Sequence, residues 1–322
     1  MKTLFGEVVK HPAKIDQEAV ELALTKAFAK VQTDEDLAAL FVSPASEVYQ
    51  YILLQSDQAA CSNTSLLFNP HRFSVSYVDA RGKNLLTAIK DPKYIKGLAR
   101  LLIARTAQKR PNLFFAFQHR INNISLVKDF PPIIARRFAK RFGVSQESCV
   151  LDPCGGWGGR MLGISSICDY YTCFEPSTKT YQGLKRLARW IQDIRPTFQA
   201  TVHHLPFEEA TLPKSTFDFA ITSPPYYDTE LYSDESTNSC NRYSTWDAWV
   251  DGFYLPMICK TMDALKPGKV FLLNIGTKRY RMDYPLKRLA TTYRIKQVSR
   301  NPGLMGENED RNSEVFYTIQ KI

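Results

Sequence analysis

Val-Leu-Asp-Pro-Cys-Gly-Gly-Trp-Gly-Gly-Arg, residues 150–160, is the stretch that decides the fold. The apolar residues before Asp152 predict a buried strand, and the glycines after it predict a tight turn into a helix over residues 161–167. Glycines in such a turn let the backbone approach a ligand closely, and the helix N-terminus favours negative charge. The dinucleotide pattern G-x-G-x-x-G fits poorly, because its third glycine would fall on Met161. The stretch therefore predicts the first strand, loop and helix of a ligand-binding α/β sheet.

The rest of the chain from about residue 130 continues this alternation of helix and strand, which is typical of a doubly wound sheet. Strands are expected at 148–152, 170–174, 200–204, 217–222 and 269–275, with a closing antiparallel pair at 295–300 and 315–321. Lys266-Pro-Gly268 predicts a tight turn before the fifth of these strands. Glu175 ends the second strand about twenty residues beyond the loop, where Rossmann-type sheets place the carboxylate that holds ribose hydroxyls.

A second motif, Thr-Ser-Pro-Pro-Tyr-Tyr at residues 222–227, follows the apolar strand that ends at Thr222. Two prolines fix φ and remove two backbone donors, so the chain leaves the sheet stiff, with uncommitted carbonyls. An amine on a flat base can donate to Ser223 Oγ and the Pro224 carbonyl while Tyr226 stacks on the ring. Taken alone, the motif also fits an ordinary proline-rich turn.

Together the two motifs resemble those of amino-group DNA methyltransferases. Asp152-Pro-Cys-Gly-Gly-Trp-Gly158 is similar to their S-adenosylmethionine loop, usually Asp-Pro-Phe-x-Gly-x-Gly. Thr222-Ser-Pro-Pro-Tyr226 resembles their catalytic loop, in which Asp, Asn or Ser precedes Pro-Pro and Tyr or Phe follows. Lys128-Asp-Phe-Pro-Pro132 resembles the segment that packs on the methionine end of the cofactor. The resemblance covers about residues 128–322, with Cys154 where Phe is usual and Trp157 where a small residue is usual.

The resemblance implies an α/β fold with a Rossmann-like class I methyltransferase sheet, mostly parallel with a terminal antiparallel strand. A mostly helical N-terminal extension, residues 1–120, would precede a catalytic domain of residues 121–322. The implied cofactor is S-adenosylmethionine, with binding residues Pro131, Asp152, Pro153, Cys154, Gly155, Gly156, Gly158, Glu175 and Glu208. The implied catalytic residues are Ser223, Pro224, Pro225 and Tyr226. For Glu208, a solvated carboxylate at a helix start is an open alternative to a contact with adenine.

The charge of the chain favours a polyanionic partner. Its 322 residues carry a formal net charge of +10, and basic residues cluster ahead of the catalytic region. That cluster is Lys93, Lys96, Arg100, Arg105, Lys109, Arg110 and Arg120, followed by Arg136, Arg137, Lys140 and Arg141. Phe114, Phe115 and Phe117 lie between the two groups and fit core packing better than base stacking. The expected substrate-binding residues are Tyr227, Asp228, Tyr232, Arg120 and Arg136.

The expected reaction is methylation of an exocyclic amine in DNA after base flipping. In the resembling family, Ser before Pro-Pro favours cytosine N4, with adenine N6 left open. RNA amino-methylation, protein glutamine methylation and nucleic-acid binding without catalysis are the alternatives. The loop of residues 227–246 either closes over the base or is merely solvated.

The remaining composition bears on metal, redox state and location. No metal site is expected, since none of the seven cysteines forms C-x-x-C and no His pair has ligand spacing. The cysteines show no spacing typical of a disulfide framework, which indicates reduced thiols. No apolar run reaches membrane-spanning length. These features predict a cytoplasmic protein with no membrane partner, and leave its oligomeric state unknown.

Overall fold

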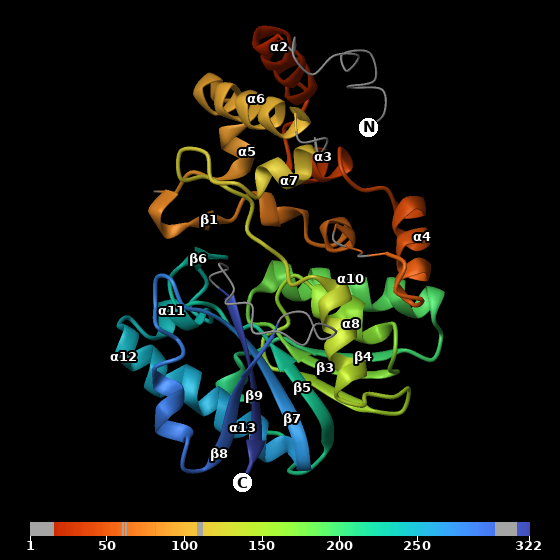
Figure 1. The fold of residues 1–322 in the computed structure, drawn as a ribbon, viewed down its shortest axis with the longest axis vertical. Coiled ribbons are helices and arrows are strands. Elements are labelled where there is room, and N and C mark those ends of the chain that lie inside the picture. Colours follow the sequence, from red (N-terminus) through yellow and green to blue (C-terminus); the bar gives the residue numbers. More distant parts are fainter. Residues whose placement is uncertain (1–15, 60, 62, 81, 108–111, 300–313) are drawn as a thin grey trace. The chain divides into compact units, whose positions relative to one another are not determined.

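A seven-stranded sheet forms the centre of the larger part of the chain (Figure 1). The computed structural model describes residues 16–59, 61, 63–80, 82–107, 112–299 and 314–322. The strands are β2 (Cys149–Asp152), β3 (Tyr170–Phe174), β4 (Gln199–His203), β5 (Phe217–Thr222), β7 (Leu265–Gly276), β8 (Tyr293–Val298) and β9 (Glu314–Lys321). Their order is β4–β3–β2–β5–β7–β9–β8. The first five run parallel, and β9 lies antiparallel to both β7 and β8.

Both faces of this sheet are covered at its centre, which explains why β2, β5 and the later part of β7 are largely apolar. Val150 belongs to a core cluster with residues of α8 (Pro132–Arg141), α9 (Gly159–Ser165) and α10 (Thr178–Ile194). Leu151, the next residue of β2, belongs to the opposite cluster with residues of α13 (Leu255–Ala264). Phe219 and Ala220 of β5 divide in the same way. Successive side chains thus point to alternate faces, so each strand contributes to two cores.

Two connections of the sheet depart from a regular doubly wound unit. Between β4 and β5 the chain forms only a 3-10 turn, η5 (Phe207–Glu209), where an α-helix is usual. Before α13 the chain forms α12 (Trp246–Trp249) and then a π-helical turn over Val250–Tyr254. The predicted turn at residues 266–268 is a kink inside β7, because Gly268 takes φ +75° while the pairing with β5 shifts register.

The smaller part of the chain is mostly helical. It contains α2 (Gln17–Phe28), α3 (Asp34–Ala39), α5 (Leu85–Ala88), α6 (Pro92–Ala107) and α7 (Leu113–Phe117). Asp16 caps α2, accepting from the Glu18 amide at 3.0 Å. Phe114 and Phe117 are buried, which confirms core packing for these two, whereas Phe115 is exposed beneath the Arg105 guanidinium. Lys109 and Arg110 of the predicted basic cluster lie outside the described residues.

One strand expected in this part is largely absent. The alternation around Phe73, Val75 and Tyr77 predicts a strand, but Phe73 ends a 3-10 turn, Pro70–Phe73, and only Ser76–Tyr77 (β1) is extended. Phe73 and Val75 are buried and Ser74 is exposed, which is the alternation of a half-buried strand. Here a turn produces that alternation, and it is closed by a hydrogen bond from Ser74 N to His71 O.

Contacts divide the chain into two units. The helical unit comprises the described residues of Met1–Val42 and Pro70–Lys128, and the sheet unit comprises Ser43–Asn69 and Asp129–Ile322. This division differs from the expected boundary at residue 120. The segment that contains α4 (Pro44–Leu54) packs with the sheet unit, where the Tyr51 hydroxyl lies 2.9 Å from Ser165 Oγ.

The predicted fold class is confirmed. The order β4–β3–β2–β5–β7–β9–β8 is that of a Rossmann-like class I methyltransferase sheet with one antiparallel strand, accompanied by a mostly helical N-terminal region. Among the described residues, no helix combines the length and apolar character needed to cross a bilayer. All seven cysteines fall within them and are free thiols.

Candidate active site at the carboxyl edge of the sheet

The two sequence motifs meet where the strand order reverses. From β2 the chain proceeds outward through β3 and β4, and from β5 it proceeds the other way through β7. Parallel pairing joins Leu151 to Ala220, so the loops after β2 and β5 leave the same edge side by side. A switch point of this kind is the usual ligand site of an open α/β sheet.

A buried carboxylate connects the two loops. Asp152 is fully buried at the end of β2, and its Oδ1 accepts from Thr222 Oγ1 at 2.7 Å and from Cys154 N at 3.2 Å. Its Oδ2 accepts from Arg160 Nε at 2.7 Å and from the Tyr171 hydroxyl at 2.6 Å. Four donors fill the four lone-pair sites of a carboxylate. Asp152 therefore organises the site from beneath and has no acceptor left for a ligand.

The glycine-rich loop is shaped by two left-handed residues. Gly156 has φ +56° and Gly158 has φ +97°, and a side chain is disfavoured at both angles. A Cβ on Gly158 would also lie 2.4 Å from Leu187, so this glycine permits packing on α10. A Cβ on Gly156 would meet no heavy atom closer than 3.6 Å. A Cβ on Gly156 would thus make only ordinary van der Waals contacts, with Arg160 and the Cys154 carbonyl, so the loop is less crowded there than at Gly158.

Glu175 lies directly against this loop. Its Oε2 accepts from Gly156 N at 3.1 Å and its Oε1 from Ser177 N at 2.9 Å, which leaves acceptor capacity on each oxygen. Burial raises the pKa of Glu175 to about 7, opposed by the amide hydrogen bonds and by Arg160. A buried carboxylate with free lone pairs is suited to accept from a pair of hydroxyl groups.

The corner after β5, residues 223–226, forms a chain of polar contacts. Ser223 Oγ lies 3.2 Å from the Tyr226 hydroxyl, which donates to Asn274 Oδ1 at 3.4 Å. Since that proton is used on Asn274, the Ser223 hydroxyl is the donor to Tyr226, and Ser223 Oγ keeps its lone pairs. Burial raises the pKa of Tyr226 well above its usual value, so the phenol stays neutral. Pro224 is buried and Pro225 is exposed, as expected for a stiff exit from the sheet.

The last strand of the parallel set makes room for Tyr226. A Cβ on Gly276, at the end of β7, would lie 2.8 Å from the Tyr226 ring, so the ring rests on the backbone there. Asn274 is buried in the same strand, and its amide nitrogen lies 3.4 Å from the Val315 carbonyl. Asn274 was not predicted to lie in the site, and Thr222 and Arg160 were part of the two motifs but were given no role. The only sequence signal for Asn274 is a polar residue inside the apolar run of residues 270–275.

Tyr227 turns away from the corner. It takes φ +55° and is buried among Trp246, Trp249 and Tyr280, with ring centroids 5.2–6.0 Å away. Asp228 accepts from the Tyr280 hydroxyl at 2.8 Å and pairs with Arg279. Both residues were expected to bind substrate, but the structure gives them an anchoring role for the corner.

The following segment, residues 229–242, is called the strap. It includes β6 (Glu230–Leu231) and α11 (Ser239–Arg242). Tyr232 stacks on Trp157 of the glycine-rich loop, with centroids 4.5 Å apart. Glu235 accepts from the Thr178 amide and from its hydroxyl at 2.7 Å, at the start of α10. Tyr232 was expected to contact substrate, whereas here it lies on the glycine-rich loop.

The far end of the strap is fixed to the β4 edge. Arg242 pairs with Glu208 at 3.3 Å and with Glu209 at 2.5 Å. Neither carboxylate oxygen of Glu208 has a hydrogen-bond partner among the described residues, and burial raises its pKa. Lys260 holds the neighbouring backbone by donating to the Glu208 carbonyl at 2.6 Å. Glu208 is therefore a largely buried carboxylate that is ion-paired with Arg242 and can accept a further hydrogen bond.

Several other residues expected in the site lie in or beside the glycine-rich loop. Pro131 caps α8, and the adjacent Asp129 accepts from Gly159 N at 3.3 Å. Pro153 is buried, Gly155 N donates to the Phe174 carbonyl, and burial raises the pKa of the Cys154 thiol.

Two arginines expected to bind substrate have protein partners instead. Arg136 is buried, and it donates to Asp57 Oδ1, to the Gln55 carbonyl and to Ser166. These contacts give it a structural role. Arg120 belongs to the helical unit, where it pairs with Asp79 at 2.6 Å and lies over the Tyr77 ring.

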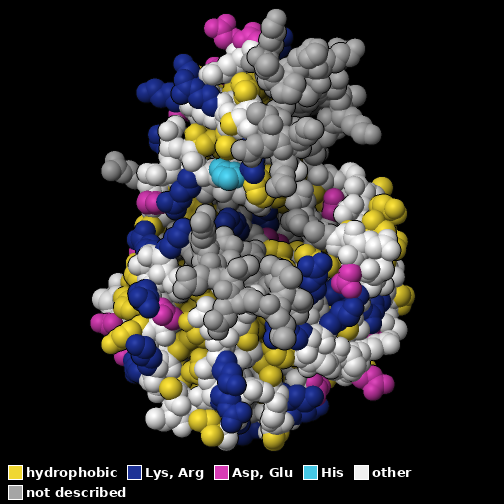
Figure 2. All heavy atoms as spheres, viewed as in Figure 1, with side chains coloured by type: hydrophobic (Ala, Val, Ile, Leu, Met, Phe, Trp, Pro, Cys, Tyr) yellow, Lys and Arg dark blue, Asp and Glu magenta, His cyan; other side chains and the backbone are white. Residues whose placement is uncertain are grey.

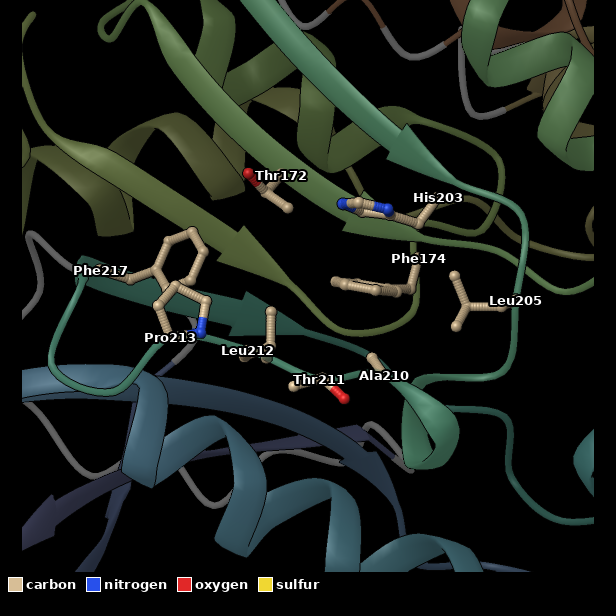
Figure 3. A pocket seen from close by; sticks show the side chains of 9 residues that line it. All are labelled: Thr172, Phe174, His203, Leu205, Ala210, Thr211, Leu212, Pro213 and Phe217. Atoms are coloured by element: carbon tan, nitrogen blue, oxygen red, sulfur yellow. The ribbon is translucent and has the colours of Figure 1, made fainter.

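A shallow apolar pocket of about 300 Å³ lies on the sheet face beside β4 (Figure 3). Phe174 and His203 stack there, with ring centroids 4.5 Å apart, and Leu205, Leu212 and Pro213 come from the β4–β5 connection. The pocket exists because that connection has no α-helix. It contains none of the residues expected in the site.

Comparisons with known proteins return structural neighbours only. No family model matches the chain, and no curated protein matches its sequence. An rRNA methylase from Streptococcus thermophilus is 12% identical, with 58% of this chain and 93% of that one covered and a TM-score of 0.39. A glycopeptide N-methyltransferase complexed with S-adenosylmethionine is 17% identical, with 58% and 92% covered and a TM-score of 0.41. A SAM-dependent O-methyltransferase from Thermotoga maritima is 13% identical, with 69% and 71% covered and a TM-score of 0.41. The fold assignment rests on the strand order.

Proposed function

We propose that the chain transfers a methyl group from S-adenosylmethionine to an exocyclic amine of a base in DNA. The observation that carries this proposal is the position of Thr222. Its hydroxyl accepts from Cys154 N at 3.1 Å and donates to Asp152, which binds the glycine-rich loop to the Ser223–Tyr226 corner. A loop that cradles a donor and a corner that grips an amine thus border one region at the switch point of the sheet.

The chemistry of the loop residues fits this cofactor. Glu175 offers buried acceptors for two ribose hydroxyls, and the Glu208 carboxylate, which is ion-paired with Arg242, has acceptor capacity left for an adenine amine. Gly156 takes the left-handed conformation and is less crowded than Gly158, which suits close approach of a ligand to the backbone, and Pro131 lies at the start of the adjacent helix. Cys154, Gly155 and Gly158 shape the loop, while Pro153 and Asp152 support it from below.

The chemistry at the corner is mainly positioning. Bound S-adenosylmethionine would supply a methyl group attached to a sulfonium sulfur, and this sulfur is an excellent leaving group because it departs as a neutral thioether. Ser223 Oγ and the Pro224 carbonyl accept hydrogen bonds from the two N–H groups of the amine. This favours a more tetrahedral nitrogen, with its lone pair facing the methyl donor. The Tyr226 ring holds the base, a contact worth roughly 1–3 kcal/mol. Alignment of this kind lowers a barrier by up to about 7–11 kcal/mol in the best intramolecular cases.

The nucleic-acid partner follows from charge. The chain carries a net charge of +10, and dark-blue Lys and Arg side chains are spread over the visible face of both units (Figure 2). Lys93, Lys96 and Arg100 are exposed on α6 at a spacing that places them along one side of the helix. Ser223 at the head of the corner favours cytosine N4 over adenine N6, by resemblance to family members with Ser-Pro-Pro.

The test is incorporation of a labelled methyl group. The protein is incubated with labelled S-adenosylmethionine and, separately, with duplex DNA, RNA or protein, and the products are digested and identified. We expect N4-methylcytosine from DNA, and far less of it from Tyr226→Ala than from the wild-type protein. Label in RNA with none in DNA would move the assignment to an RNA amino-methyltransferase, and label on protein glutamine would move it to a protein methyltransferase. Cofactor binding without methyl transfer to DNA, RNA or protein would leave the remaining alternative, a chain that binds nucleic acid without catalysing methylation.

A further inference from the structure

Arg160 occupies an unusual place for a cation. It lies in the first turn of α9, where the helix dipole disfavours positive charge, and only 4% of its surface is exposed. Burial of a guanidinium is costly unless it is paired and hydrogen-bonded. Arg160 meets this requirement with Asp152 on one side and the carbonyl of Cys154 on the other. The face of its guanidinium lies over the Phe130 ring, 5.5 Å from the centroid.

The backbone of the glycine-rich loop is fixed at successive groups. Cys154 N bonds to Asp152 and Thr222, Gly155 N bonds to the Phe174 carbonyl, and Gly156 N bonds to Glu175. Arg160 adds a hold on the Cys154 carbonyl, which sets the peptide plane between Cys154 and Gly155. The same guanidinium grips the carboxylate that holds Thr222, the residue before Ser223. One side chain thus reaches both halves of the site, and its Nη2 would also lie 3.6 Å from a Cβ on Gly156.

We propose that Arg160 is a positioning residue that orients the glycine-rich loop for the methyl donor and couples it, through Asp152 and Thr222, to the catalytic corner. This inference rests on the proposed function. Both contacts require the planar fork of a guanidinium, since its nitrogens reach a carboxylate and a carbonyl in one plane. A lysine keeps the charge beside Asp152 but presents a single nitrogen, so it cannot hold both groups in the same way.

The sheet unit offers a matched control at its opposite edge. Arg195 donates to Asp169 at 2.5 Å and to the Ile167 carbonyl at 3.3 Å, so it also joins a carboxylate to a main-chain carbonyl. Asp169 immediately precedes β3, at the amino end of the strand. Arg195→Lys therefore perturbs a comparable pair away from the candidate site.

The experiment measures S-adenosylmethionine affinity by calorimetry and stability by thermal unfolding for the two lysine variants. We expect Arg160→Lys to bind roughly 10- to 100-fold more weakly, the range expected for loss of a charge-assisted hydrogen bond. Arg195→Lys should keep the wild-type dissociation constant with a similar loss of melting temperature. Wild-type affinity in folded Arg160→Lys would overturn the inference, while failure of the wild-type protein to bind would instead overturn the proposed function.

A second pair tests the coupling through Thr222 and serves if Arg160→Lys does not fold. Thr222→Val removes the hydroxyl with little change of shape, and Thr222→Ser retains it. We expect Thr222→Val to weaken cofactor binding about tenfold and Thr222→Ser to restore it. In the double variant Thr222→Val with Arg160→Lys, the fold-loss of cofactor affinity should be smaller than the product of the two single fold-losses. Both substitutions act through Asp152, so their effects overlap. Equal affinity in Thr222→Val and Thr222→Ser, or independent losses in the double variant, would contradict the coupling.

Discussion

At the scale of single residues, the Tyr226 hydroxyl and the Tyr226 ring have separate roles. The hydroxyl lies between Ser223 and Asn274, and the ring rests on the backbone of Gly276. Tyr226→Phe removes only the first role, so Ser223 Oγ loses its orientation. We expect kcat to fall by about tenfold, as for loss of one neutral hydrogen bond, with an unchanged dissociation constant for the cofactor.

Tyr226→Ala removes the ring as well. We expect a further loss of roughly 10- to 100-fold in kcat/KM for the nucleic acid, equivalent to 1–3 kcal/mol of stacking. Steady-state kinetics and calorimetry on the two variants measure both effects. Equal activities of the Phe and Ala variants would show that the ring does not hold the base.

Glu175 makes cofactor binding depend on pH. Burial is the main cause that raises its pKa, from 4.5 to about 7. The ionised carboxylate is the stronger acceptor for ribose hydroxyls, so affinity should rise as the pH increases through about 7. Calorimetry between pH 6 and pH 8 measures this change. Glu175→Gln should bind weakly and without the pH dependence; retention of the same pH profile would exclude Glu175 as its source.

The same group predicts the opposite trend for the stability of the free protein. A raised pKa means that the folded state holds the proton more tightly than the unfolded chain, so its stabilisation is present below pH 4.5 and is lost as the pH rises through about 7. The loss is on the order of 3 kcal/mol. The difference in free energy of unfolding between wild type and Glu175→Gln, followed by denaturant titration across this pH range, isolates the effect. A difference that does not change with pH would contradict the assigned pKa.

At the scale of elements, the strap is held over the glycine-rich loop rather than over the catalytic corner. Tyr232 covers Trp157, Glu235 binds the first turn of α10, and Arg242 pairs with Glu208. We therefore expect the strap to loosen when a cofactor enters or leaves. We expect Glu235→Ala to increase the dissociation rate of the cofactor severalfold, because it removes the hydrogen bonds to Thr178.

Asp234 supplies the control for this prediction, since it is an exposed acid next to Glu235. Asp234→Ala should leave the dissociation rate unchanged. Stopped-flow measurement of cofactor release distinguishes the two variants. An unchanged rate in Glu235→Ala would mean that the strap does not limit exchange.

The sequence predicted the elements of the sheet better than the contacts of the site. The central strands β2, β5 and the later part of β7 are apolar runs between turn signals, and their local pattern is enough to place them. The network around Asp152 joins Arg160, Tyr171 and Thr222, which are far apart in the chain, so no local pattern reveals it. Arg136 was expected to be available because it lies on a basic helix, but Ser43–Asn69 packs against that helix and supplies its partners Gln55 and Asp57.

The turn of Tyr227 into the core has a similar explanation. The two prolines predict a stiff exit, but the sequence does not show that φ becomes positive at Tyr227. The aromatic residues that receive its ring, Trp246, Trp249 and Tyr280, all come later in the chain. Local chemistry thus identified the corner, while tertiary packing decided which of its two tyrosines faces the site.

At the scale of the whole molecule, the net charge of +10 should appear as a salt dependence of nucleic-acid binding. Lys93, Lys96 and Arg100 are exposed on α6, and changing all three to alanine should reduce the slope of log K against log salt by about 3 for DNA.

A matched control is the triple alanine variant of Lys266, Lys269 and Lys321. These lysines pair with Asp218 or Asp263 at the edge of the sheet opposite the candidate site. Binding isotherms at several salt concentrations give both slopes. Equal reductions in the two variants would mean that charge acts without a preferred surface, and an unchanged slope in the α6 variant would remove α6 from the phosphate-binding surface.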